Sequence, residues 1–184
     1  PVVGLAGELA LTRDGTLYHL VDGEVPSEPT SGGATVYVAL SFHTNYYHSY
    51  RGDTPDEDGY GMDIRVIRRI LEWLDEYPQV HADWDSDNAF TTDDWMLEDS
   101  PDIIEGIAAR VAAGTDDVRL MSWNNGAVAA QTREEFDESI QRAFASNEAT
   151  FGRVVPGVQP QECMFTPEHI GWYRELGIEW VTLF

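Results

Sequence analysis

Polar and aromatic side chains follow four predicted strands of this chain, at the points where those strands end. The segments are Ser41–Asp53, Asp83–Phe90, Ser122–Gly126 and Gln159–Pro167. In parallel α/β sheets and barrels, active sites gather at the carboxyl ends of the strands. Aromatic rings offer flat apolar platforms for sugar faces, whereas Asn, Asp, His and Glu supply hydrogen-bond partners for hydroxyl groups. This combination predicts a carbohydrate-binding cleft.

Eight residues of these segments are expected to contact substrate: His43, Asn45, Asp83, Trp84, Asp85, Trp123, Asn124 and Asn125. Asp83, Asp85 and Asp87 alternate around Trp84, so an extended chain would place the three carboxylates on one side. A solvated acidic loop is the alternative interpretation of that alternation. For His43 the alternative is a satisfied, half-buried imidazole. For Trp123, Asn124 and Asn125 the alternative is that they form the turn after the third strand and do not contact substrate.

The elements that must position these residues alternate in type from Ala34 onward, which predicts βαβ units and a parallel sheet. Five strands are expected: Val36–Phe42, Val80–Trp84, Val118–Trp123, Val154–Val158 and Ile178–Phe184. Helices are expected between them, over about 63–77, 101–113, 132–147 and 166–176. Pro101 and Gly114 mark the ends of the second helix, and a Thr132–Glu135 capping box begins the third. We expect the loops after the first four strands to share one edge.

The N-terminal region has a different pattern. Alternation over residues 8–21 around Asp14-Gly15 predicts a β-hairpin, and the segment Pro26–Gly33 has the composition of a linker. The chain therefore divides into a hairpin appendage with its linker, residues 1–33, and an α/β domain, residues 34–184. Because the chain begins at Pro1 without Met, we expect it to be processed, cut or excerpted.

The charge balance is strongly acidic. The chain has 33 Asp and Glu against 11 basic residues, all of them Arg, which gives a net charge of −22. Its hydrophobic content of 42% is that of a folded domain and not of an acidic tail. At molar salt the screening length falls to about 3 Å, so we interpret the acidity as salt adaptation. An acidic domain from an ordinary cell is the alternative.

The same composition restricts partners and location. Nucleic acid is not expected as a partner, because no basic stripe exists to displace counterions from phosphates. No apolar run reaches the roughly 18 residues of a transmembrane helix, so no membrane association is expected. Cys163 is the sole cysteine, which excludes an intrachain disulfide and a Cys-based zinc site. We expect a high-salt cytoplasm, no cofactor and no bound metal; the oligomeric state stays open.

Three segments together resemble glycoside hydrolase family 57. The first, GVQPQECMFTPEHIGWYRELGIEWV (157–181), has a Gly-Val lead, a Glu five residues after the Gly and a Pro-Glu pair five residues beyond. It resembles the family's nucleophile region. AAQTREEFDESIQRAF (129–144) resembles the helix after the third strand, and VALSFHTNYYHSY (38–50) resembles the opening strand. The resemblance covers about residues 34–184.

Membership of that family would imply a retaining α-glycosidase or transglycosylase on an incomplete seven-stranded β/α barrel, acting on a carbohydrate of the α-glucan type. Glu162 would be the nucleophile, and a second carboxyl about 5–5.5 Å away would protonate the leaving oxygen. In the family this acid is an Asp on a strand later than any in these 184 residues. The family's first motif, His-x-His-Gln-Pro, reads His43-Thr44-Asn45-Tyr46-Tyr47 here, so Asn45 replaces the second His.

Two other functions remain open. Metal-dependent carbohydrate deacetylases use a related partial barrel, and His43, His48, Asp83 and Asp85 could imitate their metal ligands. Their usual His-x3-His spacing is absent, because His43 and His48 stand five residues apart. The other alternative is a non-catalytic sugar-binding protein that keeps the cleft. For Glu162 itself, the alternative is a surface glutamate in a very acidic protein.

Overall fold

The computed structural model describes residues 2–6, 9–12, 17–19, 40–46 and 61–182. The chain forms two compact units, residues 1–38 and 39–184. In the first unit, β1 (Val2–Ala6), β2 (Leu9–Thr12) and β3 (Leu17–His19) form an antiparallel sheet with β2 in the centre. Strand β1 was not predicted. The Asp-Gly turn and the linker lie outside the described residues, and the division at residue 33 stays a prediction.

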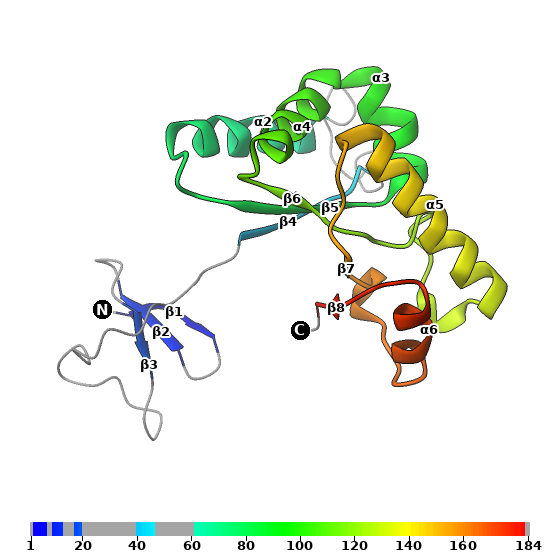
Figure 1. Ribbon diagram of the computed structural model, residues 1–184. Coiled ribbons are helices and arrows are strands. Elements are labelled where there is room, and N and C mark those ends of the chain that lie inside the picture. The colour runs from blue at the N-terminus through cyan, green and yellow to red at the C-terminus, as the bar shows by residue number, and fades with distance from the viewer. Residues whose placement is uncertain (1, 7–8, 13–16, 20–39, 47–60, 183–184) are drawn as a thin grey trace. The chain divides into compact units, whose positions relative to one another are not determined.

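The second unit contains five short parallel strands (Figure 1). Strands β4 (Leu40–Thr44), β5 (Ala82–Ser86) and β6 (Asp117–Val118) form one sheet in that order, and β7 (Gly157–Val158) pairs with β8 (Trp180–Val181). A parallel bridge between Leu120 and Val158 joins the two sheets. The amide of Leu120 donates to the carbonyl of Gly157, and the amide of Gln159 donates to the carbonyl of Leu120. The predicted α/β fold with parallel strands is therefore confirmed.

The strand boundaries differ from the predicted ones by a few residues. Residues 36–39 of the first predicted strand and residues 183–184 of the last lie outside the described part. The third strand is β6, Asp117–Val118, followed only by the isolated bridge at Leu120, and is therefore shorter than the predicted 118–123. Beyond it the chain turns: the amide of Asn125 donates to the carbonyl of Ser122, and Asn125 has a left-handed φ of 57°.

Four helices begin and end close to the predicted residues: α2 (Gly61–Glu76), α4 (Pro101–Ala113), α5 (Arg133–Phe151) and α6 (His169–Glu175). The short helix α3 (Leu97–Asp99) was not predicted; it continues a π-helical stretch. The capping box of α5 is present, since the hydroxyl of Thr132 accepts from the amide of Glu135 while the Glu135 carboxylate accepts from the amide of Thr132. Gly114 ends α4 with a φ of 73°. Local capping chemistry thus predicted these ends correctly.

One helical segment was missed. Residues Asn88–Met96, expected as part of a loop, form a π-helical stretch directly after β5. The carboxylate of Asp87 accepts hydrogen bonds from the amides of Phe90 and Thr91 and from the Thr91 hydroxyl. Asp87 is 1% exposed. The interpretation of Asp87 as part of a solvated acidic loop is therefore wrong, because its carboxylate is buried and caps the start of a helical segment.

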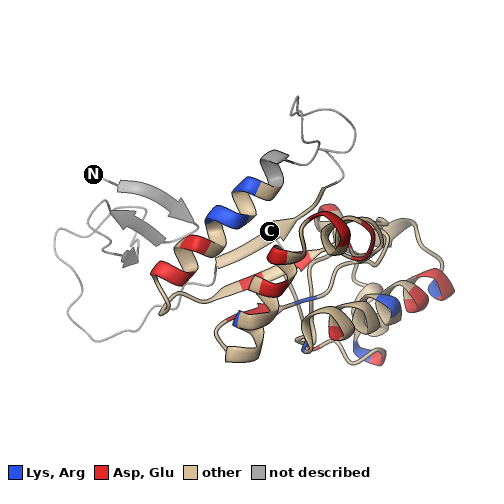
Figure 2. Cartoon of the chain, turned by 90° about the horizontal axis from the view of Figure 1, so that it is seen from above, with Lys and Arg blue, Asp and Glu red and all other residues tan. Residues whose placement is uncertain are grey.

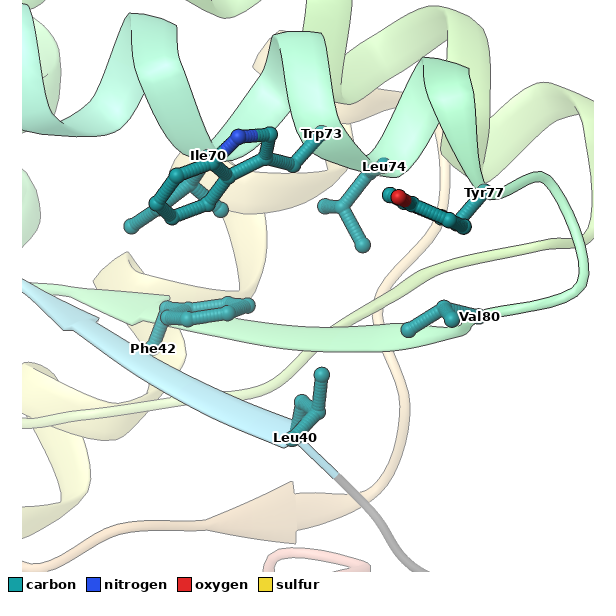
Figure 3. A pocket seen from close by; sticks show the side chains of 7 residues that line it. All are labelled: Leu40, Phe42, Ile70, Trp73, Leu74, Tyr77 and Val80. Atoms are coloured by element: carbon teal, nitrogen blue, oxygen red, sulfur yellow. The ribbon is translucent and has the colours of Figure 1, made fainter. Parts of the chain in front are cut away.

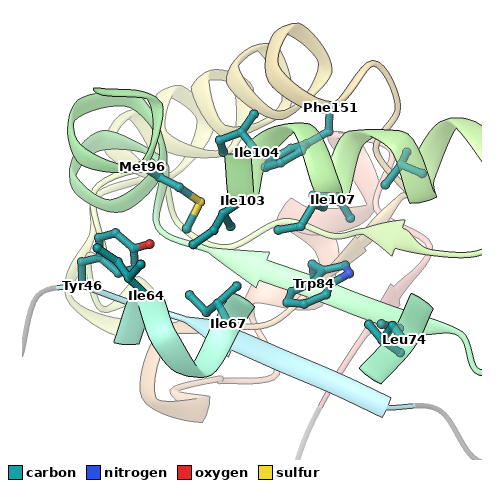
Figure 4. Packing of buried hydrophobic residues seen from close by; sticks show 13 residues of the cluster. Tyr46, Ile64, Ile67, Leu74, Trp84, Met96, Ile103, Ile104, Ile107 and Phe151 are labelled. Atoms are coloured by element: carbon teal, nitrogen blue, oxygen red, sulfur yellow. The ribbon is translucent and has the colours of Figure 1, made fainter. Parts of the chain in front are cut away.

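Helices α2 and α4 cover one face of β4 and β5, and the larger apolar core lies between these layers (Figure 4). Trp84 of β5 lies in this core, to which both helices and the π-helical segment contribute residues, among them Ile67, Leu74, Met96, Ile103 and Ile107. A second core joins α5 and α6 to the later strands through Leu120, Phe136, Ile140, Val158 and Tyr173. Since neighbouring residues of a strand point to opposite faces, the burial of Trp84 directs Asp83 and Asp85 away from this core.

Acidic residues are spread over the helices of the second unit (Figure 2). Several of the few arginines pair with them at the surface: Arg68 with Asp102, Arg133 with Asp137, and Arg142 with Glu138. Exposed pairs of this kind are each worth about 0–1 kcal/mol, so they offset only part of the repulsion that a charge of −22 creates. None of the described helices combines the length and apolar composition that a membrane crossing requires.

Candidate active site

A pocket of about 320 Å³ lies at the carboxyl ends of the parallel strands. Its lining residues are Ser41, His43, Asp85, Arg119, Met121, Gln159, Pro160, Gln161, Glu162 and Cys163. They come from β4, from β5, from the segment after β6 and from the segment after β7. Of the residues predicted to carry the chemistry, the structure brings His43, Asp85 and Glu162 together in this pocket.

His43 and Asp85 are direct partners in the register of β4 and β5. The Nδ1 atom of His43 lies 2.6 Å from Oδ1 of Asp85. The His43 side chain is 46% exposed, whereas that of Asp85 is fully buried. The hydrogen bond to Asp85 raises the pKa of His43 above its ordinary value, against the opposing effect of burial, and the charges of Asp85, Asp87 and Glu162 add to the rise. The site thus favours an imidazolium.

Arg119 is a charged residue of the pocket that the sequence analysis missed. It is 4% exposed, and its Nε and Nη2 atoms lie 2.9 and 2.6 Å from Oδ2 of Asp85. Its Nη1 lies 3.1 Å from a carboxylate oxygen of Asp83, and its guanidinium also donates to Ser41 and Thr182. The available signal was an arginine inside the apolar run 118–123, because a buried guanidinium needs carboxylate partners.

Asp83 lies beside the pocket without lining it. Burial raises its pKa from 3.8 to about 6, although the charge of Arg119 acts in the opposite direction. One of its oxygens, Oδ1, is buried without a hydrogen-bond partner among the described residues. Asp83 and Asp85 do share one side of β5, as the alternation predicted, and both contact the same guanidinium.

Glu162 lies on a strained turn. It is exposed, its φ is 51°, and the next residue, Cys163, has a φ of 56°. Left-handed backbone at a residue other than glycine costs on the order of 1–3 kcal/mol and is concentrated at functional sites. The turn is closed by the Cys163 amide, which donates to the carbonyl of Pro160. The side-chain amide of Gln161 lies 3.2 Å from Oε1 of Glu162, so the turn presents an anchored carboxylate to the pocket.

Two predicted contact residues lie elsewhere. Trp84 is 2% exposed, and its indole N–H donates to the carboxylate of Asp116 at 2.8 Å, inside the core. It cannot offer a platform to a sugar in the pocket, and the prediction for this residue is corrected: the side of β5 opposite to Asp85 faces the helices. Asn45, which follows β4, is half-buried and does not line the pocket.

The residues after the third strand belong to a separate pocket of about 390 Å³. Trp123 and Asn124 line it together with residues of α5, and the Arg142 guanidinium lies 4.8 Å from the centre of the Trp123 ring. The Trp123 indole nitrogen lies 3.3 Å from a carboxylate oxygen of Asp93. Asn125 supplies the left-handed residue of the turn. The structure thus places these three residues outside the pocket that holds His43 and Glu162.

A third pocket, of about 550 Å³, is apolar (Figure 3). It lies between α2 and β4, and its lining residues are Leu40, Phe42, Ile70, Trp73, Leu74, Tyr77 and Val80. Leu40 begins β4 and Val80 precedes β5, so this pocket lies toward the amino ends of the strands. Among the described residues its lining contains no carboxylate, imidazole or guanidinium, and the phenol of Tyr77 is its titratable group.

The metal ion of the deacetylase alternative does not fit the described residues. Among them, no group of three or more His, Cys, Asp or Glu side chains is arranged to hold a metal. Asp85 gives one oxygen to His43 and the other to Arg119, whose positive charge opposes a divalent cation at the same carboxylate. His48, the remaining expected ligand, lies outside the described residues.

Comparison with known proteins gives matches among solved structures alone: no family model and no curated protein matches the chain. A 4-alpha-glucanotransferase from Thermococcus litoralis aligns over 79% of this chain and 22% of its own, with 18% identity and a TM-score of 0.62. A family 4 carbohydrate esterase from Bacillus anthracis aligns over 78% of this chain and 57% of its own, with 17% identity and a TM-score of 0.57.

A family 4 carbohydrate esterase pseudoenzyme from Bacillus anthracis has the same fold, with 14% identity and a TM-score of 0.52 over 78% of this chain and 42% of its own. The chain therefore shares the fold of part of each of these structures. It spans about a fifth of the glucanotransferase and just over half of the esterase. At these identities the likeness concerns the fold.

Proposed function

We propose that this chain forms part of a retaining α-glycoside hydrolase or transglycosylase that acts on an α-glucan through Glu162. The observation that carries the proposal is the strained turn that holds Glu162 in the pocket of His43, Asp85 and Arg119. A carboxylate at the carboxyl end of a barrel strand has the placement that a glycosidase nucleophile requires. The family 57 resemblance of residues 157–181 supports the same residue.

In the proposed reaction, a carboxylate oxygen of Glu162 attacks the anomeric carbon and forms a glycosyl ester. The bond from that carbon to the leaving oxygen breaks, and a general acid gives the leaving oxygen its proton. Water or the hydroxyl of an acceptor sugar then attacks the ester, returns the carboxylate and gives its proton back to the conjugate base of the acid. Two inversions retain the anomeric configuration.

Neither of the two carboxyl groups in the described lining of the pocket is assigned as the general acid. Besides Glu162, the described lining contains only the carboxyl group of Asp85, and both Asp85 oxygens are bound to His43 and Arg119. Neither oxygen of Asp85 is therefore left to face the leaving oxygen of a substrate. The resemblance assigns this role to an Asp on a later strand of the barrel.

His43 is assigned to substrate binding. Its Nδ1 is held by Asp85, so Nε2 is the ring nitrogen that can donate to a sugar hydroxyl. Because its pKa is raised, the ring carries positive charge over a wider pH range than an ordinary histidine. The charge of Glu162 is among those that raise the pKa of His43, and both side chains line the same pocket.

The test is covalent labelling of the intact protein in molar KCl. A 5-fluoro-α-glucosyl fluoride carries a leaving group that needs no protonation, so the experiment does not depend on the general acid. We expect one fluoroglucosyl group on Glu162, identified by mass spectrometry of the peptide. The Glu162→Gln variant should fold, bind glycan and take no label, whereas the exposed control Glu179→Gln should be labelled like the wild type.

Other outcomes assign the chain to the alternatives. If another residue is labelled, or if Glu162→Gln turns over substrate as fast as the wild type, the assignment of Glu162 as the nucleophile is overturned. Activity on N-acetylated glycans that follows an added divalent metal and disappears with a chelator assigns the deacetylase function. Glycan binding without label or turnover assigns the non-catalytic sugar-binding function.

A further inference from the structure

We propose that Gln159 and Gln161 recognise the hydroxyl groups of a neutral sugar in the pocket of Glu162. The two side chains lie on either side of Pro160, at the carboxyl end of β7. Both line the pocket. The inference rests on the proposed function, from which it takes a glycan as the ligand. It adds the residues that would recognise the hydroxyl groups of that glycan.

Both glutamines are buried, with 6% of each residue exposed. The Oε1 atom of each is buried without a hydrogen-bond partner among the described residues. Their Nε2 atoms are in use: that of Gln159 lies 3.4 Å from the carbonyl of Pro160 and 3.5 Å from Sγ of Cys163, and that of Gln161 lies 3.2 Å from Oε1 of Glu162. Each side chain thus lines the pocket and carries an acceptor that no described residue uses; since both oxygens are themselves buried, a ligand meets them when the terminal amide group turns toward the pocket.

Buried polar atoms in folded proteins almost always have a partner, and leaving one unpaired destabilises the protein. A ligand that donates a hydrogen bond to each oxygen would recover that cost on binding. Sugar hydroxyl groups are such donors. A glycan bound in this pocket would therefore donate hydrogen bonds to the two amide oxygens that are otherwise unpaired.

The acceptors also select against anionic sugars. A carboxylate or a phosphate in the position of a hydroxyl group has no proton to donate and would leave the amide oxygen that it faces unpaired. It would also meet the carboxylates of Glu162 and Asp85, while the Arg119 guanidinium is already bound to Asp83 and Asp85. We therefore assign the pocket to a neutral hexose and exclude a uronic acid or a sugar phosphate from it.

Gln161 has a second part in the site because it holds the Glu162 carboxylate. A change at Gln161 moves the nucleophile as well as removing an acceptor, whereas Gln159 makes no such contact with Glu162. Gln159 is therefore the cleaner test of hydroxyl recognition. A loss of kcat is expected at Gln161, and a rise of KM with little change of kcat is expected at Gln159.

The experiment is calorimetric titration in molar KCl, in the Glu162→Gln background so that no turnover occurs. The probes are maltotriose and, as an anionic trisaccharide, trigalacturonate. We expect Gln159→Met and Gln161→Met to weaken maltotriose binding by about tenfold each, as one unpaired donor would predict. Gln141→Met, on the exposed face of α5, is the matched control and should bind as the parent does. Trigalacturonate should not bind.

A second series needs no change at either glutamine. Monodeoxy analogues of maltotriose, titrated against the parent protein, should include at least one that binds about tenfold more weakly, because one amide oxygen loses its donor. Equal binding of every deoxy analogue, unchanged binding in both methionine variants, absence of maltotriose binding, or tight binding of trigalacturonate would each overturn the inference.

The two proposals fail in different ways. Label on Glu162 together with unchanged binding in the glutamine variants overturns the present inference and leaves the nucleophile in place. If Glu162 takes no label while Gln159→Met binds maltotriose about tenfold more weakly, the assignment of Glu162 as the nucleophile is overturned and the recognition of hydroxyl groups stands. Circular dichroism spectra and thermal midpoints of the variants identify any change that arises from misfolding.

Discussion

The Nδ1 atom of His43 lies 2.6 Å from Oδ1 of Asp85, on adjacent parallel strands in which these two residues are register partners. The other oxygen of the same carboxylate lies 2.6 Å from the Arg119 guanidinium. Asp85 thus joins a buried cation to a half-exposed imidazole. The arrangement fixes the orientation of the His43 ring and leaves its second nitrogen for a ligand.

Replacing Asp85 should lower the pKa of His43. In Asp85→Asn the charge is removed, and with it the strongest of the interactions that raise the pKa. We expect the pKa to fall toward the ordinary value of about 6.5. An NMR titration of the His43 ring measures it. The exposed control Asp94→Asn should leave the titration unchanged, and a pKa equally high in Asp85→Asn would contradict the assignment.

Asp83 should make stability depend on pH. Its pKa is about 6 in the folded protein and 3.8 as the reference, so the folded state binds its proton more tightly than the unfolded state. The corresponding stabilisation is complete below pH 4 and is lost as the pH rises through about 6. Asp83→Asn removes this titration. Urea denaturation at several pH values should show that the variant loses less stability than the wild type between pH 4 and 6; parallel curves would refute this.

The left-handed backbone conformation of Glu162 should lower the free energy of unfolding of the protein. Because its φ is 51°, Glu162→Gly should raise the free energy of unfolding by about 1 kcal/mol relative to Glu162→Ala, which also lacks the carboxylate but keeps the Cβ. Both variants should be inert to the fluorosugar. Chemical denaturation of the pair gives the difference. If the alanine variant were as stable as the glycine variant, the turn would not be strained.

Salt should stabilise the fold. A charge of −22 repels itself at low ionic strength, and molar KCl screens that repulsion within about 3 Å. The thermal midpoint should rise from low to molar KCl, by about 2–4 °C for each 1 kcal/mol of repulsion removed. Scanning calorimetry over a KCl series measures it. A flat or falling midpoint would favour an acidic domain from an ordinary cell.

Local patterns were sufficient for helices α2, α4, α5 and α6 and for the parallel strands of the second unit. The capping box at Thr132, the proline at 101 and the glycine at 114 each act within one turn of the chain, so they can be recognised in the sequence directly. The same holds for the placement of Glu162 after β7 and of His43 near the carboxyl end of β4. Both positions follow from the βα alternation and from the rule that parallel strands end at one edge.

The sequence by itself determined which residues alternate on a strand, but tertiary structure decided which side of the strand faces the ligand. Trp84 and Asp85 are neighbours, and only the docking of α2 and α4 on β5 assigns the first to the core and the second to the pocket. The partner of Asp85, Arg119, is 34 residues away in the chain. No local pattern encodes that pairing, because a buried ion pair is specified by the meeting of two strands and not by either one alone.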